Sequence, residues 1–143
     1  MNSAIEITNL IYKYAEFIDH GDLMGAADLF KNARMKLVGS DQLQDHVATG
    51  VMLKKFVKIY GDGTPKTKHV TTNPILEIDE EAGTAACRSY YTVLQSTDEI
   101  PLQVIASGRY HDEFERVDGT WRFSYRDLTL FDMQGNINGH LSL

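Results

Sequence analysis

The chain has 143 residues, 43% of them hydrophobic and 24% charged, with a formal net charge of -6. This length suits one domain with its own core, so we expect a single domain over residues 1–143. The acidic balance and scattered basic residues exclude a nucleic-acid surface, and no apolar run approaches the roughly 20 residues that span a membrane. With no secretory signal at its start and one cysteine, Cys87, the chain is expected in the cytoplasm.

Two helices that meet at a tight corner are predicted first. Apolar residues recur at helical spacing over 3–20, which predicts the first helix. Gly21 suits its C-terminal cap, and Asp22 can cap a second, short helix that extends to Phe30.

A strand, a loop and a third helix follow. Residues 33–38 alternate enough for a strand, whereas 39–46 are polar and predict a loop. The third helix is predicted to begin with Thr49 as its cap and to end at Gly61.

The second half of the sequence predicts an antiparallel meander, because long β-rich runs alternate with turn residues. Pro74 must mark a bulge or an edge strand, since it has no N–H to donate. Helices first and a long-stranded sheet afterwards predict an α+β fold, with the helices on one face of a curved sheet and a pocket beneath them. The four predicted strands cover 68–79, 84–95, 102–116 and 120–131.

Asp19 is a candidate functional residue because it lies in the last turn of the first predicted helix, where the helix dipole disfavours a carboxylate. Its side chain borders the apolar stripe, so we expect a raised pKa. The alternative is a solvent-facing or capping carboxylate, which the periodicity alone favours.

His69 opens the long strand and shares a face with Thr71 and Asn73. An imidazole lining a pocket could act as a general base if a carboxylate held its other nitrogen. A histidine at a strand end that bonds only backbone is the simpler alternative.

The third predicted strand contributes a second candidate wall. Alternation places Val104, Ala106, Gly108 and Tyr110 on the interior face, where the small residues leave volume and Tyr110 offers a hydroxyl. Ordinary packing explains these residues equally well. The sequence has no HExxH, CxxC, GxSxG or phosphate-binding glycine motif, so we expect no metal and no cofactor.

Three stretches together resemble the SnoaL-like, or ketosteroid-isomerase-like, branch of the nuclear-transport-factor-like superfamily. They are residues 14–19 (YAEFID), residues 68–73 (KHVTTN) and residues 114–123 (FERVDGTWRF). The resemblance covers most of the chain and implies a cone-shaped antiparallel sheet wrapped around the N-terminal helices, a cystatin-like α+β barrel. It also implies pairing or trimerisation through the outer sheet face, as a homodimer or homotrimer.

Within this superfamily the sequence is most similar to scytalone dehydratase and to the dehydrochlorinase that acts on hexachlorocyclohexane. The resemblance implies catalytic roles for Asp19 as the carboxylate of a dyad, His69 as the base and Arg126 as a cation for the developing anion. Arg126 faces the pocket only if its strand bulges, because strict alternation turns it away. The substrate-binding residues expected with this site are Tyr14, Phe17, Tyr91, Val104, Ala106 and Tyr110.

Two departures from those relatives separate this chain from either specific activity. Tyr14 stands where the dehydrochlorinase has a lysine, and residues 89–91 lack the second histidine of scytalone dehydratase. The sequence therefore leaves two main hypotheses open, beside a third, a hydrolase in which Asp19 activates water and which would need other polar residues around that water. One is a cofactor-independent lyase or isomerase that abstracts a proton from a small, largely apolar molecule. The other is a non-catalytic ligand-binding or assembly subunit, as in the β subunits of ring-hydroxylating dioxygenases.

Overall fold

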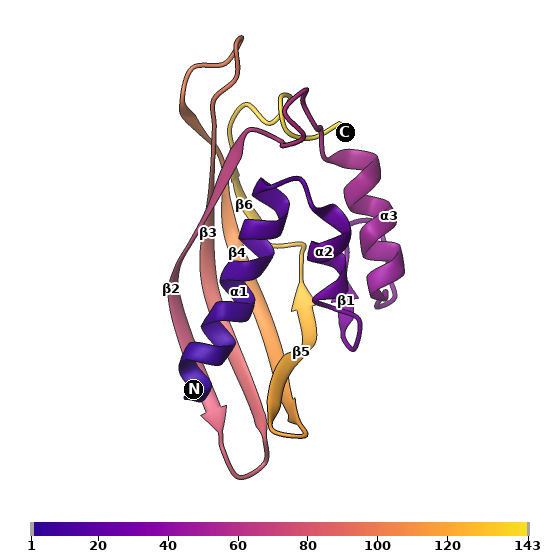
Figure 1. Cartoon of the computed structure of the whole chain (residues 1–143), viewed down its shortest axis with the longest axis vertical. Helices are drawn as coiled ribbons and strands as arrows, with labels where there is room; N and C mark the ends of the chain where they lie inside the picture. Colours follow the sequence, from indigo (N-terminus) through magenta and orange to yellow (C-terminus); the bar gives the residue numbers. More distant parts are fainter. Residues whose placement is uncertain (1, 143) are drawn as a thin grey trace.

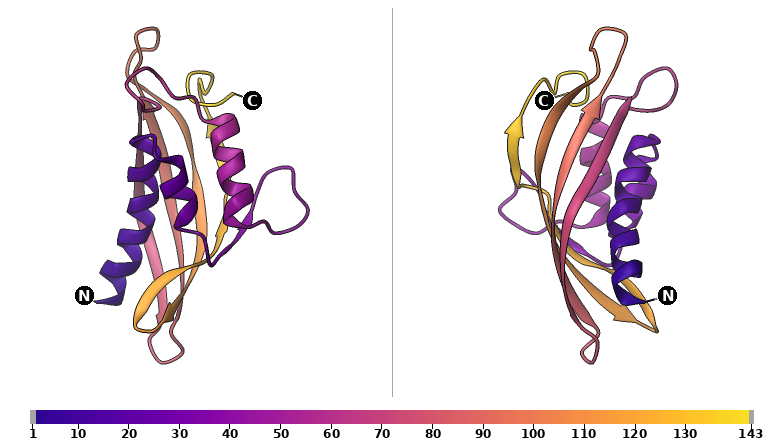
Figure 2. Two further views of the ribbon diagram at one scale, coloured as in Figure 1. Left: turned by 45° about the vertical axis from the view of Figure 1, so that its right-hand side comes forward. Right: turned by 90° about the vertical axis from the view of Figure 1, so that its left-hand side faces the viewer.

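A computed structural model describes residues 2–142 and arranges them as a curved sheet with three helices on one face (Figures 1 and 2). The N-terminus and the C-terminus lie toward opposite ends of the long axis (Figure 1). The sheet stays open, since β1 and β2 form its two edges. The elements are α1 (Ser3–Asp19), α2 (Leu23–Asp28), β1 (Arg34–Lys36), α3 (His46–Phe56), β2 (Thr67–Asp79), β3 (Thr84–Gln95), β4 (Gln103–Val117), β5 (Thr120–Asp127) and β6 (Phe131–Gln134).

The corner between α1 and α2 forms as predicted. The Gly21 N–H donates to the Ile18 carbonyl at 2.9 Å, and the Asp22 carboxylate accepts from the first turn of α2. Gly21 has a φ of +79°, and a Cβ atom there would lie 1.9 Å from the Gly63 carbonyl oxygen. Only glycine fits this corner, which fixes the end of α1 against the loop before β2.

The third helix begins and ends earlier than predicted. Its N-cap is Asp45, whose carboxylate accepts from the Ala48 N–H at 3.0 Å, and its last residue is Phe56. The predicted cap, Thr49, is wrong because this residue is fully buried inside α3, where its hydroxyl donates back to the Asp45 carbonyl. The sequence prediction missed Asp45 as the cap because this residue lies in the stretch that was assigned to a polar loop.

The antiparallel meander of β2, β3, β4 and β5 is confirmed, and two strands add to it. β1 pairs with β5 in parallel, and β6 pairs with the first half of β4. The predicted last strand over 120–131 was too long, because it ends at Asp127 and the chain then turns to form β6.

Three bulges decide which side chains face the helices. In β2 the register shifts between Thr72 and Ile75, so the bulge expected at Pro74 is confirmed and Asn73, with φ of +55°, leaves the face that it was predicted to share with His69. A second shift leaves Ile105 of β4 unpaired. A third leaves Ser124 of β5 unpaired.

The second bulge overturns the prediction for Val104. Ile105 becomes fully buried, and Val104 is 54% exposed on the outer face. The third bulge has the opposite effect on Arg126, which turns inward and is fully buried. Strict two-residue alternation fails at each bulge because one extra residue inverts every side chain beyond it.

Candidate functional site

Asp19 and His69 meet where the end of α1 crosses the start of β2. The Asp19 Oδ1 atom lies 2.7 Å from His69 Nδ1, and each side chain is 9% exposed. The Gly21 corner and the pairing of β2 with β3 hold the two backbones that carry this contact.

The Asp19 carboxylate accepts two further hydrogen bonds. The Thr67 hydroxyl donates to Oδ1 at 2.8 Å, and the His69 backbone N–H donates to Oδ2 at 2.7 Å. Burial alone would raise the pKa of Asp19, but the hydrogen bonds and charge of His69, with the Thr67 hydroxyl, outweigh burial and lower this pKa. The expected rise was therefore wrong, because the sequence did not reveal these donors.

The second ring nitrogen of His69, Nε2, has no hydrogen-bond partner among residues 2–142. A groove of about 270 Å³ between α1 and β2 reaches the pair and is lined by both its members. A carboxylate on one imidazole nitrogen and an unbonded second nitrogen, on a residue that lines a groove, form the arrangement that a general base requires.

His140 of the C-terminal tail lies against His69, which sequence reasoning missed. The two rings meet edge to face with centroids 5.5 Å apart, and His140 is 6% exposed. Burial, with His69 beside it, lowers the pKa of His140 to about 4, although Asp19 acts in the other direction. The residue lies beyond every predicted element, so periodicity carried no signal for it.

Arg126 forms a second buried pair, with Asp112 of β4. Its Nε and Nη2 atoms donate to the two Asp112 oxygens at 2.7 and 2.9 Å, and both side chains are 0% exposed. Burial would lower the pKa of Arg126, but Asp112 raises it above its ordinary value. The rings that surround the guanidinium belong to Tyr14, Phe30, Tyr110 and Phe123, with centroids 4.7, 5.3, 3.8 and 5.1 Å from its carbon.

The two buried pairs lie well apart on the concave face. His69 pairs across the sheet with Val93, whereas Asp112 pairs with Cys87, six positions away along β3. Six residues of strand correspond to roughly 20 Å. Tyr91 lies along β3 between the positions of the two pairs, and its ring stacks on that of Tyr110 with centroids 4.7 Å apart.

The remaining predicted lining residues lie on the inner side, with the exception of Val104. Tyr14 and Tyr110 are buried in the core, Ala106 is buried opposite Val93, and Phe17 packs partly buried against the same core. The volume expected at Gly108 is already filled, because a Cβ atom there would lie 2.5 Å from the Tyr91 hydroxyl oxygen.

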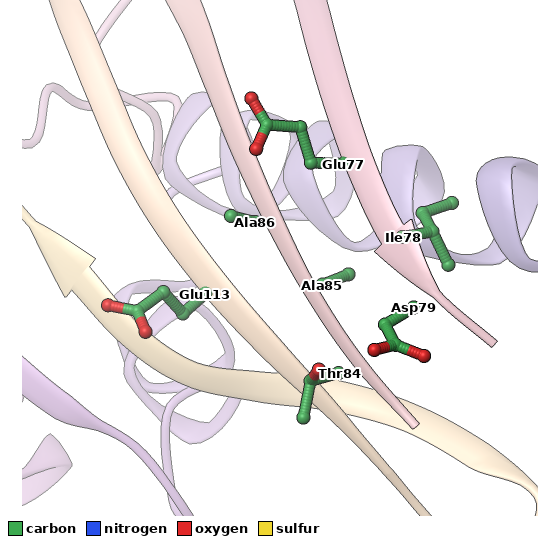
Figure 3. A pocket seen from close by; sticks show the side chains of 7 residues that line it. All are labelled: Glu77, Ile78, Asp79, Thr84, Ala85, Ala86 and Glu113. Atoms are coloured by element: carbon green, nitrogen blue, oxygen red, sulfur yellow. The ribbon is translucent and has the colours of Figure 1, made fainter. Parts of the chain in front are cut away.

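Another hollow, of about 460 Å³, lies on the opposite face near the far end of the sheet (Figure 3). Glu77 and Glu113 flank Ala86 there, and none of the predicted site residues lines it. Its side chains offer no paired acid and base. Within residues 2–142, no group of three or more His, Cys, Asp or Glu side chains is arranged to hold a metal ion, and no helix is long and apolar enough to cross a membrane.

Residues 2–127 match the SnoaL-like domain family. The chain belongs to this family. No curated protein matches the sequence significantly. The SnoaL-like fold is also that of many solved structures, among them neighbours described as cystatin-like.

Three of these structures illustrate the range of proteins with this fold. A protein of unknown function from Mycobacterium tuberculosis is 24% identical, with a TM-score of 0.70 over 94% of this chain and 74% of that one. A candidate scytalone dehydratase from Novosphingobium aromaticivorans is 22% identical, with a TM-score of 0.67 over 91% and 84%. The β subunit of a candidate aromatic-ring-hydroxylating dioxygenase from the same organism is 17% identical, with a TM-score of 0.66 over 90% and 88%. At these identities the likeness establishes the shared fold.

Proposed function

We propose that this SnoaL-like protein is a cofactor-independent lyase or isomerase that removes a proton from carbon in a small, largely apolar, cyclic molecule. His69 is the base and Asp19 its partner. The observation that carries the proposal is the 2.7 Å contact between Asp19 Oδ1 and His69 Nδ1 beside a groove.

The two residues of the pair have different roles in this chemistry. A carboxylate that accepts from Nδ1–H fixes the tautomer in which Nε2 carries the lone pair. When Nε2 takes a proton, the same carboxylate stabilises the imidazolium. The lowered pKa of Asp19 supports this role, because the carboxylate then stays ionised throughout the neutral range.

Arg126 receives a different role in this proposal from the one that the resemblance implied. Asp112 neutralises the Arg126 guanidinium. The stacked rings of Tyr91 and Tyr110 lie between this guanidinium and His69. We therefore assign Arg126 to the support of the core between the helices and the sheet. Loss of water or halide, or a shift of a double bond, would each follow proton abstraction by His69.

The test measures proton abstraction without knowledge of the natural substrate. In D2O, 2-indanone, a cyclic ketone with acidic α-protons, gains deuterium wherever a base removes those protons, and proton NMR follows the loss of signal. We expect the protein to accelerate this exchange. Asp19→Asn and His69→Gln should each lower kcat/KM by about 100-fold or more, as the loss of a general base does.

The matched control is Asp98→Asn, which removes an exposed carboxylate in the loop between β3 and β4 and should leave the rate unchanged. Equal exchange rates with the protein, with both site variants and with buffer alone would reject the proposal.

A second candidate function is a non-catalytic binding or assembly subunit, favoured by the Tyr91 ring that fills the space at Gly108. A homodimer or homotrimer through the outer sheet face accompanies either function. Its support is a set of apolar side chains on that face, partly exposed at Leu94 and exposed at Val70, Tyr90, Val104 and Met133.

A further inference from the structure

Three buried polar atoms without hydrogen-bond partners in the described part of the chain belong to residues that neighbour His69 by strand register or ring contact. Thr71, which carries the unpartnered Oγ1, is the next residue after His69 on the same face of β2. Gln95, which carries the unpartnered Oε1, pairs across the sheet with Thr67, two positions before His69. His140 Nδ1 belongs to the ring that contacts His69. Buried polar atoms almost always have partners, so this concentration indicates a polar group that the protein itself does not supply.

The tail holds His140 firmly in this position. The Lys58 N–H donates to the His140 carbonyl at 2.8 Å, and the Ser142 N–H donates to the Phe56 carbonyl at 2.8 Å. The Gln95 side chain donates to the Gly139 carbonyl at 2.9 Å. These bonds fasten the backbone on both sides of His140, so its imidazole is positioned before any ligand arrives.

We propose that His140 is a second imidazole of the site and that its Nδ1–H binds the carbonyl oxygen of a substrate whose adjacent carbon loses a proton to His69. This inference rests on the proposed function and narrows its substrate class to carbonyl compounds with an acidic α C–H. The geometry that supports it is a buried, unpartnered nitrogen on a ring in contact with the base.

The step balances within the two imidazoles and the substrate. His69 Nε2 forms a bond to the α-proton, the C–H electron pair becomes the new C=C bond, and the carbonyl π electrons move to oxygen. The resulting enolate oxygen accepts the hydrogen bond of His140. In a β,γ-unsaturated carbonyl compound, the imidazolium of His69 then returns its proton to the γ carbon as the carbonyl re-forms and the C=C bond shifts to the α,β position, which completes an isomerisation. In a β-hydroxy carbonyl compound, the carbonyl re-forms, the electron pair makes the Cα=Cβ bond, and the imidazolium protonates the β-hydroxyl group, which leaves as water.

A neutral imidazole suits this role better than a charged one. The depressed pKa keeps His140 uncharged, so it adds no positive charge beside the base. A neutral donor aimed at an oxygen that becomes negative stabilises the transition state more than the ground state. Halide elimination would not need such a donor.

His140 lies beyond the family match, which ends at residue 127. This makes His140 a feature of this chain and not one that membership of the family implies.

The test uses 2-naphthol, a planar phenol whose oxygen stands in for the enolate oxygen. Calorimetry gives its Kd, and ¹⁵N NMR reports the imidazole of His140. His140→Phe keeps a ring without nitrogen, and His140→Asn places an amide donor near the Nδ1 position. We expect His140→Phe to raise the Kd by about tenfold, and we expect the Kd of His140→Asn to stay within about threefold of that of the original protein.

A packing role predicts the reverse order, with Phe tolerated and Asn harmful. His111→Phe, on the exposed outer face, is the matched control and should leave Kd unchanged. Thermal unfolding of each variant identifies any that fail to fold. Whether or not the variants fold, His140 ¹⁵N signals that saturating 2-naphthol leaves unmoved would overturn the inference.

The outcome is separable from that of the proposed function. If 2-naphthol contacts His140 but 2-indanone exchange does not depend on His69, the oxygen site stands and proton abstraction fails. If exchange depends on His69 while the His140→Phe variant binds 2-naphthol with an unchanged Kd, the proposed function stands and the role of His140 fails.

Discussion

Two buried pairs, each of a carboxylate and a basic side chain, lie on the concave face, and they differ in their exposure to solvent. Asp112 and Arg126 join through two parallel bonds, are sealed from solvent and are enclosed by four aromatic rings. Asp19 and His69 join through one side-chain contact and border a groove. Burial alone therefore does not mark a reactive site. Each pair leaves one nitrogen without a hydrogen-bond partner among the described residues, Arg126 Nη1 and His69 Nε2, but it is the second pair that lines a groove.

The largest expected effect comes from breaking the sealed pair. Asp112→Ala leaves an unpaired guanidinium in the core, and we expect the free energy of unfolding to fall by about 3–5 kcal/mol, measured by urea denaturation. The double variant Asp112→Leu with Arg126→Met should recover most of this loss, because both charges are then gone. A loss below about 1 kcal/mol in the single variant would contradict a structural role for this pair.

A smaller effect is expected from His140, which packs against the Asp19–His69 pair and makes the stability of the fold depend on pH. The pKa of His140 is about 4 in the folded protein and near 6.5 in the unfolded chain, so only the unfolded state takes up this proton between those values. Stability should therefore fall as the pH drops from 6.5 to 4, by about 3 kcal/mol from this group.

The lowered pKa of Asp19 adds a loss in the same direction, at pH values below the ordinary range of a carboxyl. Denaturation at a series of pH values checks the His140 contribution, and the matched comparison is His140→Phe, which should flatten the curve between pH 6.5 and 4. An unchanged slope in that variant would contradict burial of a neutral His140.

The same contrast explains what sequence could and could not reveal. The α+β class, the Gly21 corner and the long strands follow from periodicity and turn residues, which are local signals. The approach of Asp19 to His69 was suggested only by the resemblance, because 50 residues separate them along the chain. No spacing rule connects positions so far apart.

The residues that sequence reasoning missed depend on details without a local signature. Ser124 gives no sign that it is the extra residue of a bulge, yet it turns Arg126 into the core. Asp112 shares the parity of Tyr110 and Phe114, so a charged residue on the interior face was a readable signal. His140 reaches the site only through the path of the tail, which tertiary packing decides.

The tautomer of His69, read from the ¹⁵N chemical shifts of its imidazole at pH 8, shows directly whether this residue can act as the base. We predict a hydrogen on Nδ1, donated to Asp19, and an unprotonated Nε2 that can accept a proton from carbon. A hydrogen on Nε2 instead would leave no basic lone pair beside the groove and would contradict the assignment of His69 as the base.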